Sequence, residues 1–287
     1  MPERTVPPEP TVLPGVVDRH VHLGLVDRGR LADGPIVEVH DLGWVPEEAV
    51  TWRDRPPAGV AVRVAGPFHT AVGGYPAGRA WAPDAAVRMV TGPDDAVAAV
   101  AEASSYGVDA VKVALHTGMP LLDDATLSAL VAAAHAHGLR ALVHAEGPGQ
   151  AGRAVGAGAD VLVHAPWTER LPDDLLERGR HVTWISTLAI HAGAEQRTAL
   201  DNVRRFRAAG GRVVYGTDMG NGPTPVGVNE DEILALGRAG LEGEDLLDAV
   251  LGGPPALCSP HPRPRTAAEL VRWLADAARL PDQPQEP

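Results

Sequence analysis

The chain has 287 residues, 45% of them hydrophobic, and a formal net charge of −12 at pH 7. That length fits one large domain or two small ones with a sizeable buried core. The acidic balance argues against binding to nucleic acid or to an anionic membrane surface. No apolar run approaches the ~20 residues that cross a bilayer, and the start MPERTVPPEP does not resemble a signal peptide. We therefore expect a cytoplasmic protein, with no internal disulfide because Cys258 is the only cysteine.

Short apolar runs alternate with helical patterns along most of the chain. The runs predict strands at residues 13–22, 35–41, 60–65, 109–115, 139–144, 159–164, 181–187 and 211–218. The helical patterns cover residues 46–53, 93–106, 122–137, 172–179, 194–210, 229–239, 244–251 and 266–280. Such alternation is typical of a parallel sheet with crossover helices. Eight units favour a closed (β/α)8 barrel, the TIM barrel, over a doubly wound open sheet.

We divide the chain into three parts. Residues 1–12 are predicted to be a flexible lead-in, and residues 13–258 form the barrel. Residues 259–287 contain a Pro-rich joint and a C-terminal helix that we expect to pack on the barrel. A glycine-containing loop at residues 66–75 follows the third strand, a position where binding residues tend to occur.

Two histidines end the first predicted strand. Side chains alternate along a strand, so His20 and His22 point to the same side, one pleat apart. Two neutral imidazoles at that separation can bind one divalent metal ion. The pair alone is equally compatible with a structural role, so side chains at other strand ends decide the question.

Further side chains that can bind a metal lie at later strand ends. Lys112 lies in the fourth predicted strand, His144 and His164 end the fifth and sixth, and Asp218 ends the eighth. In a barrel the carboxyl ends of the strands converge on one mouth, where active sites are built. A single histidine at a strand end is more often structural, but six such side chains together predict a metal site.

Lys112 is the only lysine among the 25 basic residues. It lies in the apolar run 109–115, where an unpaired charged amine is costly. A lysine that extends along the apolar surface to reach water is the plainer alternative. The residue is therefore a candidate for a chemical role as well as a structural one.

Five motifs resemble those of the amidohydrolase superfamily of metal-dependent hydrolases. They are PGVVDRHVH at 14–22, GVDAVK at 107–112, LVHAEG at 142–147, GADVLVH at 158–164 and YGTD at 215–218. The resemblance covers residues 13–257 and is closest to the branch of imidazolonepropionase-like proteins and carboxylated-lysine dipeptidases. The segments VHDLG at 39–43 and Gly-Gly-Tyr at 73–75 are also similar to that branch.

The resemblance implies a centre of two divalent metal ions, zinc first, with manganese, iron, cobalt or nickel as alternatives. The implied ligands are His20, His22 and Asp218 for one ion, His144 and His164 for the other, and Lys112 for both. Lys112 matches the lysine that reacts with CO2 to form a carbamate between the two ions. A partly buried lysine is readily neutralised, and a neutral amine can attack CO2. The carbamate is an anionic oxygen ligand that suits such metals.

The resemblance also implies a reaction. A hydroxide held between the two ions is the expected nucleophile, and Asp218 is the expected general base and then general acid. The expected substrate is a small molecule whose amide, cyclic amide or peptide-like C–N bond is hydrolysed. A lactone, ester or phosphotriester hydrolase would use the same centre. A deaminase fits less well, because the spacing of Glu146 after His144 differs from the deaminase pattern, and so does a non-catalytic binding barrel.

Several other side chains follow the strands and are candidates for contacts with the substrate. They are His69, Tyr75, His116, Trp167 and His191. Each could equally be a packing residue, and His191 and Tyr75 are favoured for holding a carbonyl or an acidic group. Asp18 is the expected partner that orients a ligand histidine.

Members of this superfamily usually carry a small β-sandwich beside the barrel. Here only 12 residues precede the first predicted strand, and the last 25 residues have a helical pattern. We therefore expect the sandwich to be absent or vestigial. A homo-oligomer is possible, but the sequence does not identify its interface.

Overall fold

The structure is a computed structural model and describes residues 10–281. The strands are β1 (Thr11–Val21), β2 (Ile36–Asp41), β3 (Ala61–Val64), β4 (Phe68–Ala71), β5 (Val87–Val90), β6 (Ala110–His116), β7 (Arg140–Glu146), β8 (Val161–Val163), β9 (Thr183–Ile185), β10 (Val213–Val214), β11 (Leu251–Ser259) and β12 (Ala278–Arg279). The α-helices are α1 (Pro46–Asp54), α2 (Pro93–Ser105), α3 (Asp124–Ala136), α4 (Gln150–Gly156), α5 (Asp173–Arg178), α6 (Gly193–Ala208), α7 (Glu230–Arg238), α8 (Gly243–Val250) and α9 (Ala267–Ala275).

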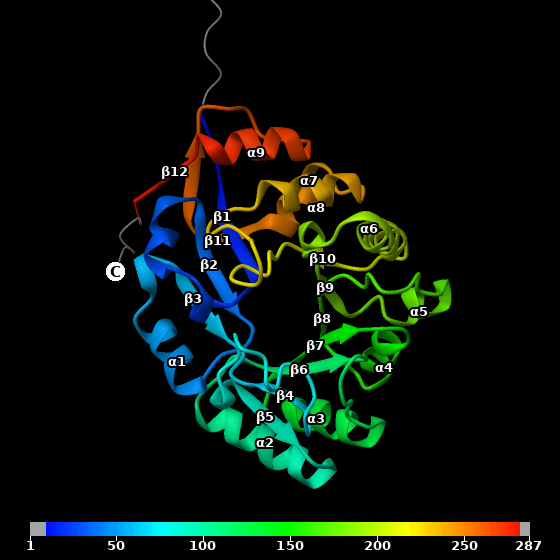
Figure 1. The fold of residues 1–287 in the computed structure, drawn as a ribbon. Coiled ribbons are helices and arrows are strands. Elements are labelled where there is room, and N and C mark those ends of the chain that lie inside the picture. The colour runs from blue at the N-terminus through cyan, green and yellow to red at the C-terminus, as the bar shows by residue number, and fades with distance from the viewer. Residues whose placement is uncertain (1–9, 282–287) are drawn as a thin grey trace, which may run out of the picture.

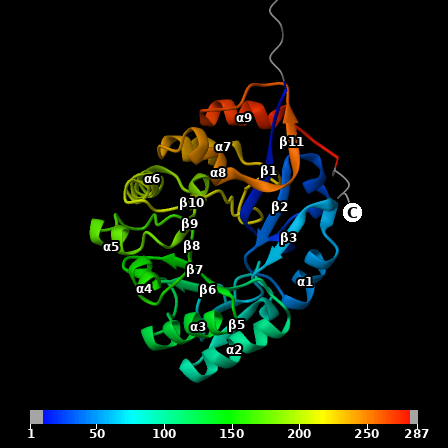
Figure 2. The ribbon, with the colours of Figure 1, turned by 180° about the vertical axis from the view of Figure 1, so that it is seen from behind.

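These strands form two sheets around a common centre, with helices on the outside (Figure 1 and Figure 2). The seven-stranded sheet has the order β10-β9-β8-β7-β6-β4-β5, and every neighbouring pair in it is parallel. The five-stranded sheet has the order β12-β11-β1-β2-β3, in which β1, β2 and β3 are parallel. The mixed α/β architecture with a parallel sheet, predicted from the alternating pattern, is confirmed.

Backbone hydrogen bonds connect the two sheets at both seams, which are the places where one sheet meets the other. At one seam the N–H of Arg19 donates to the carbonyl of Tyr215 over 3.1 Å. At the other the N–H of Asp109 donates to the carbonyl of Val64 over 2.8 Å. The segment 61–71 bends between β3 and β4, so that β3 pairs with β2 and β4 pairs with β6. The chain therefore passes from one sheet into the other within this segment.

The hydrophobic core has two parts. The larger part includes the side chains that the helices bury against the strands. The smaller part draws its members from strands and strand ends of both sheets, and so lies between the sheets. It consists of Leu42, Ala65, Ala110, Leu142, Val161, Val163, Ile185 and Val214. Burying one such Val, Leu or Ile side chain stabilises the fold by about 1.5–3 kcal/mol.

Some strands differ from the sequence prediction. β4 lies inside the segment 66–75 that we read as a loop, and β5 was not predicted, because four-residue strands give too little alternation to recognise. β11 (Leu251–Ser259) was not predicted either, since glycine and proline at residues 252–255 disfavour a strand. It forms because it pairs antiparallel with β1. Tertiary pairing thus overrides the local preference.

The two ends of the chain also differ from expectation. Of the predicted lead-in at residues 1–12, residues 1–9 lie outside the described residues, and Thr11 and Val12 already belong to β1. At the other end β12 follows α9, within a segment that we predicted to be wholly helical. Among the described residues, no helix is long and apolar enough to span a bilayer.

Candidate metal centre

Side chains from the carboxyl ends of strands in both sheets line one cavity of about 110 Å³. Six of them are the residues that the sequence resemblance marked as ligands, and each is 7% exposed or less. They are His20, His22, Lys112, His144, His164 and Asp218. The structure therefore brings together side chains that are up to about 200 residues apart in the chain.

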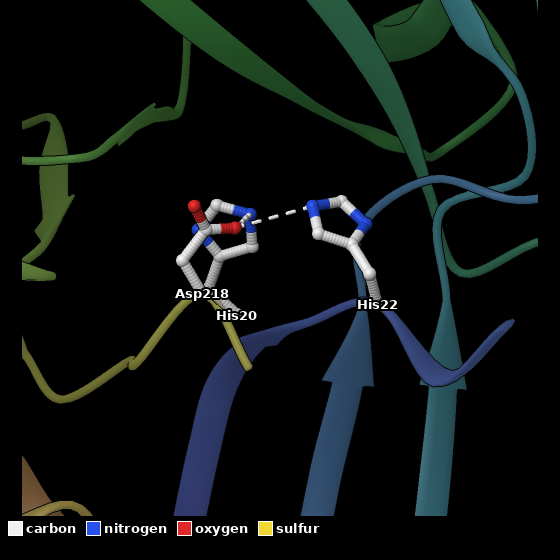
Figure 3. A group of neighbouring side chains, drawn as sticks. All are labelled: His20, His22 and Asp218. Atoms are coloured by element: carbon white, nitrogen blue, oxygen red, sulfur yellow. Dashed lines mark ion pairs between the residues drawn. The ribbon is translucent and has the colours of Figure 1, made fainter. Parts of the chain in front are cut away.

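The first group in this cavity is formed by His20, His22 and Asp218. The Oδ1 atom of Asp218 lies 3.2 Å from the Nε2 atoms of both histidines (Figure 3). Asp218 has a φ of +57°, in the left-handed region that few residues other than glycine adopt. Both ring nitrogens of His20 and the Oδ1 atom of Asp218 are buried without a hydrogen bond among the described residues. Buried lone pairs that converge in this way suit a cation.

The second group contains His144 and His164. Their ring centroids lie 5.0 Å apart with the rings nearly perpendicular, and the ring of His20 lies 4.7 Å from that of His164. The Nδ1 atom of His164 lies 2.8 Å from the hydroxyl oxygen of Thr187. The Nε2 atom of the same ring takes no part in this contact. The Nε2 atom of His144 lies 3.2 Å from a carboxylate oxygen of Glu146.

Lys112 lines the same cavity as these two groups. The residue is 2% exposed, and its ammonium nitrogen lies 5.9 Å from the centroid of the Phe68 ring. Burial lowers the pKa of Lys112 to about 7, against the opposite effect of Asp218 and Asp41. Lys112 takes part in none of the ion pairs found within residues 10–281. The amine is therefore buried without an acidic partner in that part of the chain.

Burial also determines the charge of the neighbouring groups. It lowers the pKa of His20 and of His164 well below the usual value, so both imidazoles are neutral and can donate a lone pair. Burial tends to raise the pKa of Asp218, but His20, His22 and His164 lower it well below its usual range. The site thus combines neutral nitrogen donors with an ionised carboxylate.

Asp18 acts on the backbone rather than on an imidazole. Its Oδ1 atom accepts hydrogen bonds from the N–H groups of His20 and Thr217, both over 3.1 Å. Its Oδ2 atom accepts a hydrogen bond from the Thr217 hydroxyl over 2.6 Å. Asp18 therefore holds the end of β1 against the segment that leads to Asp218. Within residues 10–281 its contact with the predicted ligand His20 is thus through the backbone N–H and not through the ring.

Three of the five candidate substrate residues lie at the cavity or beside it. Tyr75 and Trp167 line it, and Tyr75 stacks on His144 with ring centroids 5.4 Å apart. Trp167 stacks on His191 at 4.6 Å. His191 lines an adjoining pocket of about 450 Å³, to whose wall Asp218 also contributes. The cavity thus adjoins a larger pocket that shares Asp218, Ile190 and Asn221 with it.

The other two candidates do not line the cavity. His69 is fully buried, and its Nδ1 atom lies 3.0 Å from the carbonyl oxygen of Lys112. Phe68 lines the cavity, and side chains alternate along β4, so His69 points the opposite way. His116 does not line the cavity either, but its Nδ1 atom lies 2.9 Å from Glu146.

Two polar residues of the cavity were not predicted as site residues. Glu146, which we weighed against the deaminase pattern, lines the cavity and contacts both His116 and His144. These three could themselves hold a cation. Asn221 also lines the cavity, and its side-chain N–H donates to the Oδ2 atom of Asp218 over 2.8 Å. Asn221 belongs to an irregular loop, where no regular spacing of side chains predicts which residues face the cavity.

Glu232 is a buried carboxyl behind the loop that leads to His191. Its Oε2 atom accepts the N–H of Ala189 over 2.6 Å, and its Oε1 atom has no hydrogen bond among residues 10–281. Burial raises the pKa of Glu232 from 4.5 to about 7. The folded state therefore holds this proton more tightly than the unfolded state does. As the pH rises from about 4.5 to about 7, the free energy of unfolding should fall by about 3 kcal/mol from this group alone.

Replacing Glu232 with glutamine should remove this pH dependence. Urea unfolding measures the free energy of unfolding of the variant and of the unchanged protein at pH 5 and at pH 8. Relative to the unchanged protein, the variant should be more stable at pH 8 than at pH 5. The matched control is Glu230→Gln, an exposed residue of the same helix. If the difference is the same at both pH values, the buried carboxyl is not the cause.

Known proteins are similar to this chain in fold. No family model matches it, and no curated protein matches it in sequence. An Xaa-Pro dipeptidase with methionine bound in its active site has a TM-score of 0.73 and 19% identity over 93% of this chain and 84% of its own. A molinate hydrolase has a TM-score of 0.72 and 16% identity, covering 94% and 82% of the two chains. An amidohydrolase has a TM-score of 0.72 and 18% identity, covering 91% and 82%.

This chain has the amidohydrolase fold. The likeness extends over more than nine-tenths of the chain in each of these comparisons. At identities below 20% it concerns the fold alone. It agrees with the superfamily resemblance of the sequence motifs, which rests on separate observations.

Proposed function

We propose that this chain is a metal-dependent amidohydrolase that hydrolyses a C–N bond of a small substrate. One observation carries the proposal: imidazoles, a carboxylate and an unpaired lysine from distant strands line one buried cavity. The motifs shared with the superfamily and the likeness in fold to a dipeptidase and to molinate hydrolase support it. Within the superfamily, Lys112 favours the branch with a carboxylated lysine.

We propose further that the two sheets close into a (β/α)8 barrel. Its eight strands would be β1, β2, the β3–β4 segment, β6, β7, β8, β9 and β10. The hydrogen bonds at both seams support closure. In this division residues 13–258 would form the barrel, and the described part of residues 259–287, which ends at residue 281, would form a joint and a helix that pack on it. The antiparallel strands β11 and β12 would be all that corresponds to an accessory sandwich within the described residues.

The donor set fits two divalent ions, zinc first and manganese, iron, cobalt or nickel as alternatives. One ion would be held by His20, His22 and Asp218, and the other by His144 and His164. The buried lone pairs without hydrogen-bond partners support this fit. When bound, such ions polarise a substrate carbonyl and increase the acidity of water.

Lys112 would complete the site as a carbamate. The lone pair of its neutral amine forms a bond to the carbon of CO2, and one electron pair of a C=O bond moves to oxygen. The nitrogen then releases one proton to solvent. The product is an anionic oxygen donor that can contact both ions. The burial of Lys112 and the absence of an ion pair with it in the described chain support this step.

Asp218 would transfer the proton of the reaction. Its ionised carboxylate would accept a proton from the attacking water and return it to the leaving amine. The hydrogen bond from Asn221 to Oδ2 leaves Oδ1 directed toward His20 and His22. Tyr75, Trp167 and His191 would contact the substrate, and His116 would act through Glu146.

The proposal is tested by metal analysis together with a substrate panel. We expect about two metal ions per chain and turnover of at least one group among N-acyl amino acids, dipeptides and cyclic amides. Removal of the metal with a chelator should abolish turnover, and addition of zinc should restore it. Turnover confined to lactones, esters or phosphotriesters would replace the amide assignment with the alternative hydrolase. A chain that binds no metal would contradict the proposal.

A further inference from the structure

A second cavity, of about 90 Å³, lies at the opposite end of the strands from the metal centre. Arg140 opens β7 and Arg212 directly precedes β10, whereas His144 and Asp218 lie at the carboxyl ends of the same strands. No residue lines both cavities. Apolar side chains of the inner core, such as Leu142, form part of the second cavity's wall. The second cavity is therefore a separate feature of the molecule.

Three arginines that form no ion pair within residues 10–281 line this second cavity. They are Arg19, Arg140 and Arg212. The arginine ion pairs found within residues 10–281 all involve other arginines. The nearby carboxylate of Glu38 is already bound to His40 and to Arg63, over 2.8 and 2.7 Å. In a chain of net charge −12, three arginines that form no ion pair in the described part of the chain thus line one small space.

Arg19 is held in place at this cavity by the backbone. Its Nη1 atom donates to the carbonyl oxygens of Ala249 over 2.9 Å and of Val17 over 3.3 Å. Its Nε and Nη2 atoms make no such bond within the described chain. Burial lowers the pKa of Arg19 to about 10; Arg212 and Arg140 act in the same direction, and Glu38 and Asp18 act in the opposite one. The three guanidinium groups therefore repel one another, and a bound anion would offset that repulsion.

We infer that this second cavity binds a small oxyanion such as inorganic phosphate. A guanidinium presents a planar fork of N–H donors that matches the oxygen atoms of phosphate. The cavity volume of about 90 Å³ is roughly the volume that three water molecules occupy in the liquid. The cavity therefore suits a small ion rather than a nucleotide. Arg19 belongs to β1 of one sheet, while Arg140 opens β7 of the other and Arg212 directly precedes β10. The anion would therefore link the two sheets beside the seam between β1 and β10.

The experiment is a calorimetric titration of the complete protein with sodium phosphate, with sodium chloride added to keep the ionic strength constant. We expect saturable binding that weakens at least tenfold in the double variant Arg140→Ala/Arg212→Ala. Both residues are exposed and make no side-chain hydrogen bond within residues 10–281, so this variant should fold, which circular dichroism checks. Arg212→Gln, which removes one charge only, should weaken binding to an intermediate degree.

The matched control is Arg180→Ala/Arg197→Ala. It removes the same two charges from exposed arginines that form no ion pair among the described residues. We expect this control to bind phosphate as the unchanged protein does. Phosphate bound at the metal centre would bind equally well in both double variants, and this result would overturn the inference. So would an equal loss of binding in both, which would show a dependence on net charge alone. These outcomes do not depend on whether the protein is a hydrolase.

Discussion

Replacing Asp218 with asparagine is expected to lower turnover by a factor of about 10² to 10⁴ while the fold is retained. The amide cannot accept a proton at neutral pH, and it is a weaker donor to a cation than the carboxylate. Asparagine tolerates the left-handed φ of +57° at this position, so we expect no added backbone strain. Steady-state kinetics measure the effect, and circular dichroism checks the fold.

The matched control for this variant is Asp248→Asn. Asp248 is an exposed aspartate of α8 that forms no ion pair within residues 10–281. The same chemical change there should leave turnover as it was. The metal content of Asp218→Asn separates two roles: turnover lost with both ions retained indicates proton transfer, and turnover lost together with metal indicates ligation. Full activity in Asp218→Asn would rule out the proposed role.

Replacing Lys112 with alanine is expected to lower both metal content and turnover. The change removes the proposed oxygen donor between the two ions and leaves space in a buried cavity. We expect turnover to fall by about 10² to 10³-fold, the size typical of losing one group that stabilises developing charge. A short carboxylic acid such as propionate should restore part of the turnover, because its oxygen atoms can occupy the space. Metal analysis and kinetics with and without propionate check this.

The carbamate can be observed directly because the chain has a single lysine. The protein loaded with metal in the presence of ¹³C-labelled bicarbonate should show a carbamate resonance. The control Lys112→Arg keeps a long basic side chain but forms no carbamate at this position, and should lack the resonance. A chain that shows no such signal and keeps its metal in Lys112→Ala would contradict the assignment of Lys112.

The sequence by itself determined much of the candidate metal centre, because the strand pattern places particular residues at strand ends. The alternation in His20-Val21-His22 puts both imidazoles on one side, and the single lysine stands out without any structure. The parallel strand arrangement followed from short apolar runs separated by helical patterns. These inferences use only local periodicity and position, which a sequence contains in full.

Other features depended on contacts between distant segments. The distance of 3.2 Å from Asp218 to His20 and His22 arises because the end of β1 lies beside the segment after β10. β11 exists because β1 pairs with it, against the preference of its own glycine and proline residues. Pairing across such separations is a property of the folded chain, so local patterns do not contain it.

Side-chain direction at the strand ends was likewise decided by tertiary structure. His69 follows the third predicted strand as a ligand or substrate contact would, yet it is Phe68 that lines the cavity. A shift of one residue in the position of a strand reverses the side to which every side chain points. Arg19, Arg140 and Arg212 show the same limit, since no sequence spacing brings them together. The sequence therefore determined which chemical groups stand at the strand ends, and only the packing of the strands decided which of them face one another.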